Sequence, residues 1–172
     1  MTTSDNGIRT LKLCEGRVVR NGRHVIYDDQ NGLPVVTGAP LPAGATIGYG
    51  HLIKPGEDFL DGIDEDVATK LLRADLEFAE CAVCDAITAV LRQNQFDALV
   101  MLCFNIGARN FANSTVVKYI NNPNFHSGAY PTLAGAWRAW NRTGGRVSAG
   151  LRHRREIELN VYQNGIYALQ SI

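Results

Sequence analysis

The 172-residue sequence lacks a long hydrophobic run and carries no excess of charge of either sign. Its longest apolar stretches, such as residues 98–104, are far shorter than the roughly 20 residues of a membrane-spanning helix. The polar N-terminus has no apolar core, so the sequence predicts no signal peptide and no stable membrane insertion. We therefore expect the protein to accumulate in the cytoplasm of the cell that makes it, and its length fits a single domain, residues 1–172.

Cysteine is scarce, and the four present form no recognisable metal or disulfide pattern. Cys81 and Cys84 make a CxxC, a spacing that occurs in metal and redox sites. No second CxxC or closely spaced histidine pair completes a zinc set, and the motif lies inside a helical pattern. We interpret the cysteines as reduced core residues, and expect neither a metal nor a cofactor.

The formal net charge is zero, but the charges are unevenly distributed. Residues 1–97 contain nine basic and 15 acidic side chains, whereas residues 98–172 contain eight basic and two acidic ones. This asymmetry predicts a cationic C-terminal part that faces a polyanion; the alternative is a solvated basic face without a partner. The arginines expected to supply the attraction are Arg138, Arg142, Arg146, Arg152, Arg154 and Arg155.

Turn and cap residues predict an α+β fold with the strands near the N-terminus. A first helix over residues 4–15, capped by Ser4 or Asp5, ends at Gly16. Asn21-Gly22 between two β-branched runs predicts a hairpin with a type I′ turn. We expect a β-rich lobe over residues 17–62 and a helical lobe over 63–172. The predicted helices span residues 64–92, beginning at Asp64, and then 94–106, 115–121, 132–140 and 150–163.

Two features of the helical part concern packing. In the helix over 64–92, an apolar stripe is predicted through Val67, Leu71, Phe78 and Ala82. Asp75 lies on that stripe, so its carboxylate needs a partner. Trp137 and Trp140 are interpreted as core residues, with a smaller chance that one ring edge reaches a ligand.

Three polar residues are candidates for chemistry. Glu15 ends the first helix at the negative pole of its dipole, beside apolar neighbours, and both conditions favour the protonated form that a general acid requires. Asp29 follows the hairpin, and Thr46 opens the glycine-containing segment TIGYGH, where backbone can approach a ligand. Each signal alone is also explained by a solvated helix end, a turn or a strand bend.

The order of these segments resembles the signature of phage-type lysozymes (endolysins, glycoside hydrolase family 24). The resemblance covers nearly the whole chain. Its N-terminal part rests on residues 13–16, 27–32 and 46–51. Its C-terminal part rests on Gln95-Phe96-Asp97-Ala98-Leu99, Phe104-Asn105-Ile106-Gly107, Phe111, Ser114-Thr115, Trp137, Trp140-Asn141-Arg142, Gly144-Gly145, Gly150-Leu151 and Arg154-Arg155-Glu156.

The resemblance implies a lysozyme-like fold with an active-site cleft between the two lobes, and a catalytic set of Glu15, Asp29 and Thr46. Asp28 competes for the second role, but the family pattern Tyr-x-Asp-x-x-Gly selects Asp29. An insert over residues 33–45 separates Asp29 from Thr46, where the family usually has only a few residues. Insertions into surface loops cost little stability.

Further roles are expected for three residues. Tyr49, in the glycine-containing segment, and Asn105, after the central apolar run, are expected to contact substrate. The resemblance also implies that His51 pairs with Asp75, and we favour this structural pair over a catalytic His51.

The sequence thus predicts a muramidase that lyses host cells by hydrolysing the β-1,4 bond between N-acetylmuramic acid and N-acetylglucosamine, with inversion at the anomeric carbon. The expected partner is the glycan strand of peptidoglycan, which the protein reaches after release from the cytoplasm. We expect a monomer that binds no nucleic acid. The alternatives are a wall-binding protein without catalysis, and a lysozyme delivered as an antibacterial effector or virion component.

Overall fold

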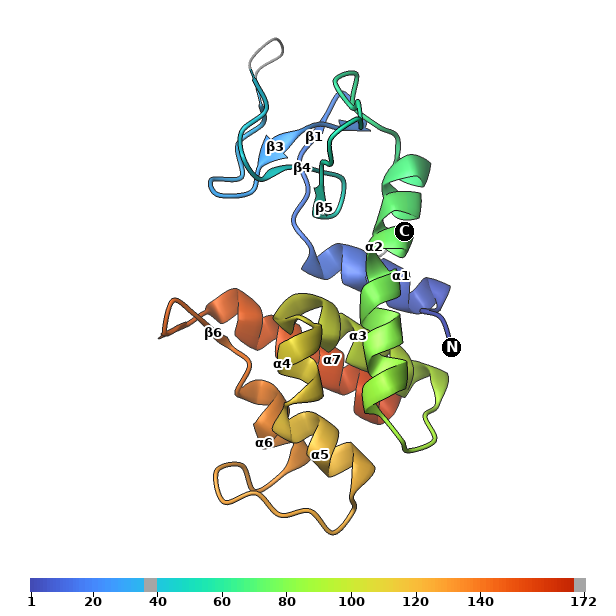
Figure 1. The fold of residues 1–172 in the computed structure, drawn as a ribbon, viewed down its shortest axis with the longest axis vertical. Coiled ribbons are helices and arrows are strands. Elements are labelled where there is room, and N and C mark those ends of the chain that lie inside the picture. The colour runs from blue at the N-terminus through green and yellow to red at the C-terminus, as the bar shows by residue number, and fades with distance from the viewer. Residues whose placement is uncertain (36–39, 169–172) are drawn as a thin grey trace. The chain divides into compact units, whose positions relative to one another are not determined.

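The structure, a computed structural model, describes residues 1–35 and 40–168 (Figure 1). The chain divides into two compact units. Residues 12–75 form the first, here called the small unit; residues 1–11 and the chain from Leu76 onward form the second, the large unit. Helices and short antiparallel strands make up both, so the fold class is α+β.

The first helix, α1 (Asp5–Cys14), begins at the predicted cap and ends one residue earlier than predicted, at Cys14 instead of Glu15. The Ser4 hydroxyl accepts a hydrogen bond from the backbone N–H of Gly7 at 3.1 Å, which satisfies a donor that the first helical turn leaves unpaired. Glu15 follows directly after the last helical residue.

The small unit contains five short strands: β1 (Val19–Arg20), β2 (Arg23–His24), β3 (Tyr27–Asp28), β4 (Ala45–Ile47) and β5 (His51–Leu52). The hairpin β1–β2 is confirmed, and Asn21 and Gly22 have φ values of 48° and 76°, both positive as a type I′ turn requires. Strand β4 is the middle of a three-stranded sheet, visible in Figure 1, in which Tyr27 pairs with Thr46. The middle of the insert, residues 36–39, lies outside the described residues.

Helix α2 (Glu65–Ala86) begins as predicted, because the Asp64 carboxylate accepts from the N–H of Val67 at 2.8 Å. It ends at Ala86 rather than near residue 92. The predicted apolar stripe is wrong by one position, and Phe78 is 50% exposed. Asp75 interrupts the predicted stripe, whereas the stripe that is buried is apolar at every turn. The buried stripe consists of Ala68, Leu72, Leu76, Ala79 and Val83.

Helix α3 (Gln93–Ile106) forms the core of the large unit, and residues 96–103 are all buried. Helix α7 (Ala149–Asn164) packs along it (Figure 1). Two elements were not predicted, the short helix α4 (Ala108–Ala112) and a hairpin around Gly144-Gly145. The remaining elements are α5 (Thr115–Asn121), α6 (Leu133–Arg138), β6 (Arg142–Thr143) and β7 (Arg146–Val147).

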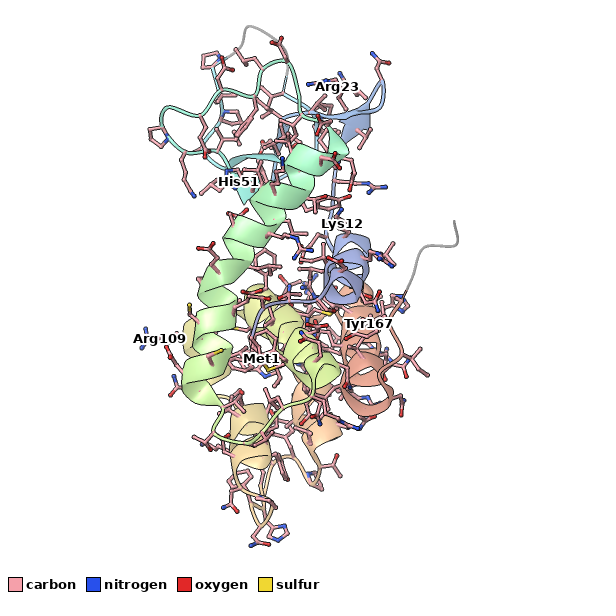
Figure 2. The ribbon with its side chains drawn as sticks, turned by 90° about the vertical axis from the view of Figure 1, so that its right-hand side faces the viewer. Met1, Lys12, Arg23, His51, Arg109 and Tyr167 are labelled. Atoms are coloured by element: carbon pink, nitrogen blue, oxygen red, sulfur yellow. The ribbon has the colours of Figure 1, made fainter. Side chains whose placement is uncertain are left out.

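Asp97 is a fully buried carboxylate that joins both ends of the described chain to α3. Its oxygens accept from the backbone N–H and hydroxyl of Ser4, at 3.0 and 2.5 Å, and from Gln93 Nε2 at 2.8 Å. The hydroxyl of Tyr167, labelled in Figure 2, donates to it at 2.7 Å. These donors compensate the cost of burying the charge.

A second buried charge cluster lies on α7 and corrects one expectation. Glu158 accepts from Arg154 Nε at 3.0 Å, from Arg155 Nη2 at 2.9 Å and from Trp137 Nε1 at 2.8 Å. Arg154 and Arg155 are buried, so they stabilise the large unit instead of forming part of a basic surface. Trp137 is a core residue as predicted, and Trp140 is only partly buried.

Within residues 1–35 and 40–168, none of the helices combines the length and the apolar character needed to cross a bilayer.

Candidate active site

Glu15 owes its position to the end of α1. The helix stops at Cys14, and Glu15 leaves it partly buried, at the start of the connection to β1. A carboxylate at this end of a helix lies next to carbonyl groups that no longer have partners in the helix. The role of Glu15 as proton donor stays a prediction.

Hydrogen bonds separate the roles of the two neighbouring aspartates. The Asp28 carboxylate accepts from the backbone N–H of Gln30 at 2.9 Å and from Asn31 Nδ2 at 2.8 Å. These bonds form the turn after β3, so Asp28 is a turn residue. The side chain of Asp29 is exposed instead. The choice of Asp29 as the second carboxylate stays a prediction.

Asp29 and Thr46 converge on one backbone carbonyl despite the 17 positions between them. The Thr46 hydroxyl donates to the carbonyl oxygen of Gly44 at 2.8 Å, and the Asp29 backbone N–H donates to the same oxygen at 3.5 Å. Thr46 itself is buried, in the middle strand of the sheet. Gly44, near the end of the insert and two residues before Thr46, therefore lies beside the backbone of Asp29.

Tyr27 pairs with Thr46 and is close enough to Asp29 and Glu15 for their charges to act on its hydroxyl, and sequence reasoning gave it no role of its own. It is buried on β3 directly opposite Thr46. Burial raises the pKa of its hydroxyl, the negative charges of Asp29 and Glu15 raise it further, and a hydrogen bond from the Gly50 backbone opposes them. Both carboxylates therefore act on one phenol. The alternation of side chains in a strand could have drawn attention to Tyr27, two residues before Asp29.

Tyr49 lies in the framework of the small unit. It is 2% exposed, its hydroxyl donates to Glu65 Oε1 at 2.7 Å, and the Tyr49 hydroxyl oxygen accepts from Arg17 Nη1 at 2.7 Å. Burial and the bond to Glu65 raise its pKa to about 12. With its hydroxyl bound on both sides by protein groups, Tyr49 can support the segment that carries Thr46.

Asn105 belongs to the large unit, where it lies at the exposed end of α3. Its side-chain oxygen accepts from Arg155 Nη2 at 2.7 Å, so the buried charge cluster fixes its orientation. Asn105 also lines a cavity of about 520 Å³, whose other walls are Ile106, Asn110, Ala139, Trp140, Arg142, Thr143 and Leu151. The mixture of aromatic and polar groups is suited to a polar ligand.

The predicted pair of His51 and Asp75 is confirmed. His51 Nδ1 lies 2.8 Å from one Asp75 oxygen and 3.0 Å from the other. Figure 2 shows the labelled His51 beside α2, which carries Asp75. The structure adds a third member that was not predicted, because His51 Nε2 lies 3.0 Å from Glu57 Oε2. Both ring nitrogens of this buried histidine therefore face carboxylates.

No group of three or more histidine, cysteine or acidic side chains is arranged to hold a metal ion in the described parts of the chain. Cys103 is a core residue as predicted, and burial raises the pKa of its thiol to about 11. The prediction was wrong for Cys81 and Cys84, which are exposed on α2.

The fold and the similar proteins together define an α+β glycoside hydrolase of the lysozyme class. More specifically, the chain belongs to the phage lysozyme family, whose model matches residues 23–158. The endolysin of Salmonella phage P22 is 36% identical over 163 residues, which is 92% of this chain and 97% of that protein. The endolysin of Bacillus phage B103 is 38% identical over 167 residues, and the match covers 96% of this chain but only 55% of that longer protein.

Solved structures show the same likeness. An endolysin from Escherichia coli O157:H7 phage FAHEc1 superposes with a TM-score of 0.76 at 31% identity, covering 98% of this chain and 97% of that one. The muramidase domain of SpmX from Asticaccaulis excentricus superposes with a TM-score of 0.71 at 29% identity, covering 95% and 98% respectively.

Proposed function

We propose that the protein is a muramidase, which hydrolyses the β-1,4 bond between N-acetylmuramic acid and N-acetylglucosamine in bacterial peptidoglycan. The observation that carries the proposal is that Asp29 and Thr46 share the Gly44 carbonyl as hydrogen-bond acceptor, in the same small unit as Glu15. Two carboxyl groups that flank the scissile bond are the usual requirement for glycoside hydrolysis. The names of the relatives, endolysin and muramidase domain, support the same substrate.

In the proposed mechanism, Glu15 donates its proton to the glycosidic oxygen while the bond from that oxygen to the anomeric carbon breaks. A water molecule attacks the anomeric carbon from the opposite face of the sugar ring. Asp29 accepts the proton that this water loses, so one proton enters and one leaves in each turnover. No metal or cofactor takes part.

The hydrogen bonds of Thr46 suggest how the water is oriented. Because the Thr46 hydroxyl already donates to Gly44, its oxygen is left to accept. A water that donates one hydrogen to Thr46 and the other to Asp29 turns a lone pair away from both residues. That lone pair would face the anomeric carbon. Tyr27 pairs with Thr46 across the sheet and supports the strand that carries it.

Product analysis tests both the bond and the mechanism. We expect digestion of purified peptidoglycan to create new N-acetylmuramic acid reducing ends, measured by reduction and mass spectrometry. NMR of the fresh product, recorded before mutarotation, should show the α anomer first, because attack by water inverts the anomeric carbon. New N-acetylglucosamine reducing ends would refute the bond assignment. A β anomer appearing first would refute the role given to Asp29 and Thr46.

A further inference from the structure

Glu65, the first residue of α2, binds side chains from three separate segments of the small unit. Its Oε1 accepts from Lys12 Nζ at 2.7 Å and from the Tyr49 hydroxyl at 2.7 Å. Its Oε2 lies 2.9 Å from His24 Nε2. One carboxylate therefore joins the end of α1, the β1–β2 hairpin and the segment after β4 to the start of α2.

Both cations of this cluster lie close to Glu15 in the sequence, Lys12 three residues before it and Arg17 two residues after. Lys12, labelled in Figure 2, is on the last turn of α1, and its Nζ lies 5.2 Å from the centre of the Tyr49 ring. The Arg17 guanidinium donates to the Tyr49 hydroxyl and lies 5.7 Å from the same ring centre. Tyr49 thus contacts the chain on both sides of Glu15.

Glu65 stays ionised and Tyr49 stays protonated across the neutral pH range. Burial of Glu65 would raise its pKa, but hydrogen bonds from Lys12, His24 and Tyr49 lower it to about 2. The Tyr49 hydroxyl, with a pKa of about 12, remains a donor. Among the described residues, His24 Nδ1 has no hydrogen-bond partner, which places the proton of the neutral ring on Nε2, toward Glu65.

The backbone of His24 is also hydrogen-bonded, to Ile63. Its N–H donates to the carbonyl of Ile63 at 2.8 Å, and its own carbonyl accepts from the N–H of Ile63 at 2.9 Å. A side chain at Gly62 would come within 2.7 Å of that carbonyl, so only glycine permits this approach. The cluster is therefore attached to the small unit independently of residues 12–17.

We propose that Glu65 and Tyr49 are positioning residues that hold the Glu15 segment, residues 12–17, in place for proton donation. Glu15 lies just past the last residue of α1, between Lys12 and Arg17, so the contacts of these two residues determine where its backbone runs. The inference rests on the proposed function. Displacement of the general acid weakens proton donation in the transition state and changes substrate binding little. Loss of the positioning contacts should therefore lower kcat and leave KM nearly unchanged.

The test compares Tyr49→Phe, Glu65→Gln and Lys12→Met with Asp64→Ala as the matched control. Asp64 is adjacent to Glu65 and caps the same helix, but the cap bond to Val67 is its contact with α2, away from residues 12–17. Kinetics on soluble peptidoglycan fragments would be measured well below each melting temperature. We expect each of the three variants to lower kcat about tenfold with KM changed less than about twofold. Asp64→Ala should keep the wild-type kcat.

Two further measurements separate positioning from general destabilisation. Lys12→Arg keeps a cation and a donor, so it should restore most of the kcat lost in Lys12→Met. Amide hydrogen exchange of residues 14–16 should be faster in Tyr49→Phe than in Asp64→Ala. Tyr49→Phe, which retains the ring, decides the matter if a Glu65 variant does not fold.

The outcomes also distinguish this inference from the proposed function. If Glu15→Gln is inactive while Tyr49→Phe and Glu65→Gln keep the kcat of Asp64→Ala, the positioning role is wrong and the muramidase assignment stands. If Glu15→Gln retains wild-type activity, the assignment of Glu15 fails and the positioning role fails with it.

Discussion

His51 illustrates how a single buried side chain joins distant parts of the small unit. Asp75 on α2 binds one ring nitrogen and Glu57, from the loop before α2, binds the other. The imidazole is 4% exposed, so the loss of either carboxylate leaves a nitrogen with a poorer partner in a poorly solvated place. The arrangement holds β5 against α2, only a few residues beyond Thr46.

We predict that Asp75→Asn lowers the free energy of unfolding by about 2 kcal/mol at pH 7, because one charge partner of a buried histidine is lost while Glu57 remains. Urea denaturation measures the change. Glu57→Gln is the matched control at the opposite nitrogen, and should cost less than about 1 kcal/mol because Glu57 is more exposed. An unchanged stability in Asp75→Asn would show that the pair contributes nothing.

The contribution of Glu57 to stability depends on pH, and its direction follows from the pKa of Glu57. The Lys54 backbone N–H and then His51 lower the pKa of Glu57 from its ordinary value of 4.5. An acid with a lowered pKa in the folded state stabilises the protein above its unfolded-state pKa and loses that contribution as pH falls. The stability difference between wild type and Glu57→Gln should therefore shrink below about pH 4.5.

Among the secondary structure elements, local chemistry predicted the boundaries best. Ser4, Asp64 and Asn21-Gly22 satisfy or shape the backbone within a few residues, so the start of α1, the start of α2 and the first hairpin follow from sequence. The buried face of α2 did not follow from the sequence. Two adjacent stripes of that helix carry apolar residues, and packing against the rest of the chain selected the one through Leu72 and Leu76.

The residues of the candidate site also fall into those that the sequence indicated and those that it did not. Glu15, Asp29 and Thr46 were selected because the order of their segments resembles the family signature, and their catalytic roles stay predictions. Glu57 was not recognised although its partner His51 lies only six positions before it, and Tyr27 was read only as part of the family pattern. Glu65 was missed because its partners lie far away in the sequence, such as Lys12, 53 positions before it. Strand pairing and helix packing bring such partners together, and a residue pattern does not record them.

For the whole molecule, the structure changes which arginines can attract an anionic wall. Arg154 and Arg155 are buried around Glu158, and Arg138 forms a two-bond pair with Glu156 at 2.6 and 2.8 Å. The exposed members of the predicted set that remain are Arg142, Arg146 and Arg152. The basic surface of the large unit is therefore smaller than the sequence suggests.

We predict that replacing Arg142, Arg146 and Arg152 together by glutamine reduces the salt dependence of binding to isolated sacculi. Binding of the wild type should weaken as salt rises past roughly 0.1 M, where screening acts over about 10 Å. Arg155→Gln is the contrasting variant, and should lower stability by about 3 kcal/mol because it breaks a buried pair. A triple variant with the salt dependence of wild type would argue for a solvated basic face without a partner.

Glu15→Gln tests the central claim most directly, because it keeps the size of the side chain and removes its transferable proton. The measurement is the loss of turbidity of outer-membrane-permeabilised cells, wild type against variant, with circular dichroism to show that both are folded. We predict a lytic rate at least about a hundredfold lower with an unchanged fold. A folded Glu15→Gln protein that clears the cells at the wild-type rate would contradict the account.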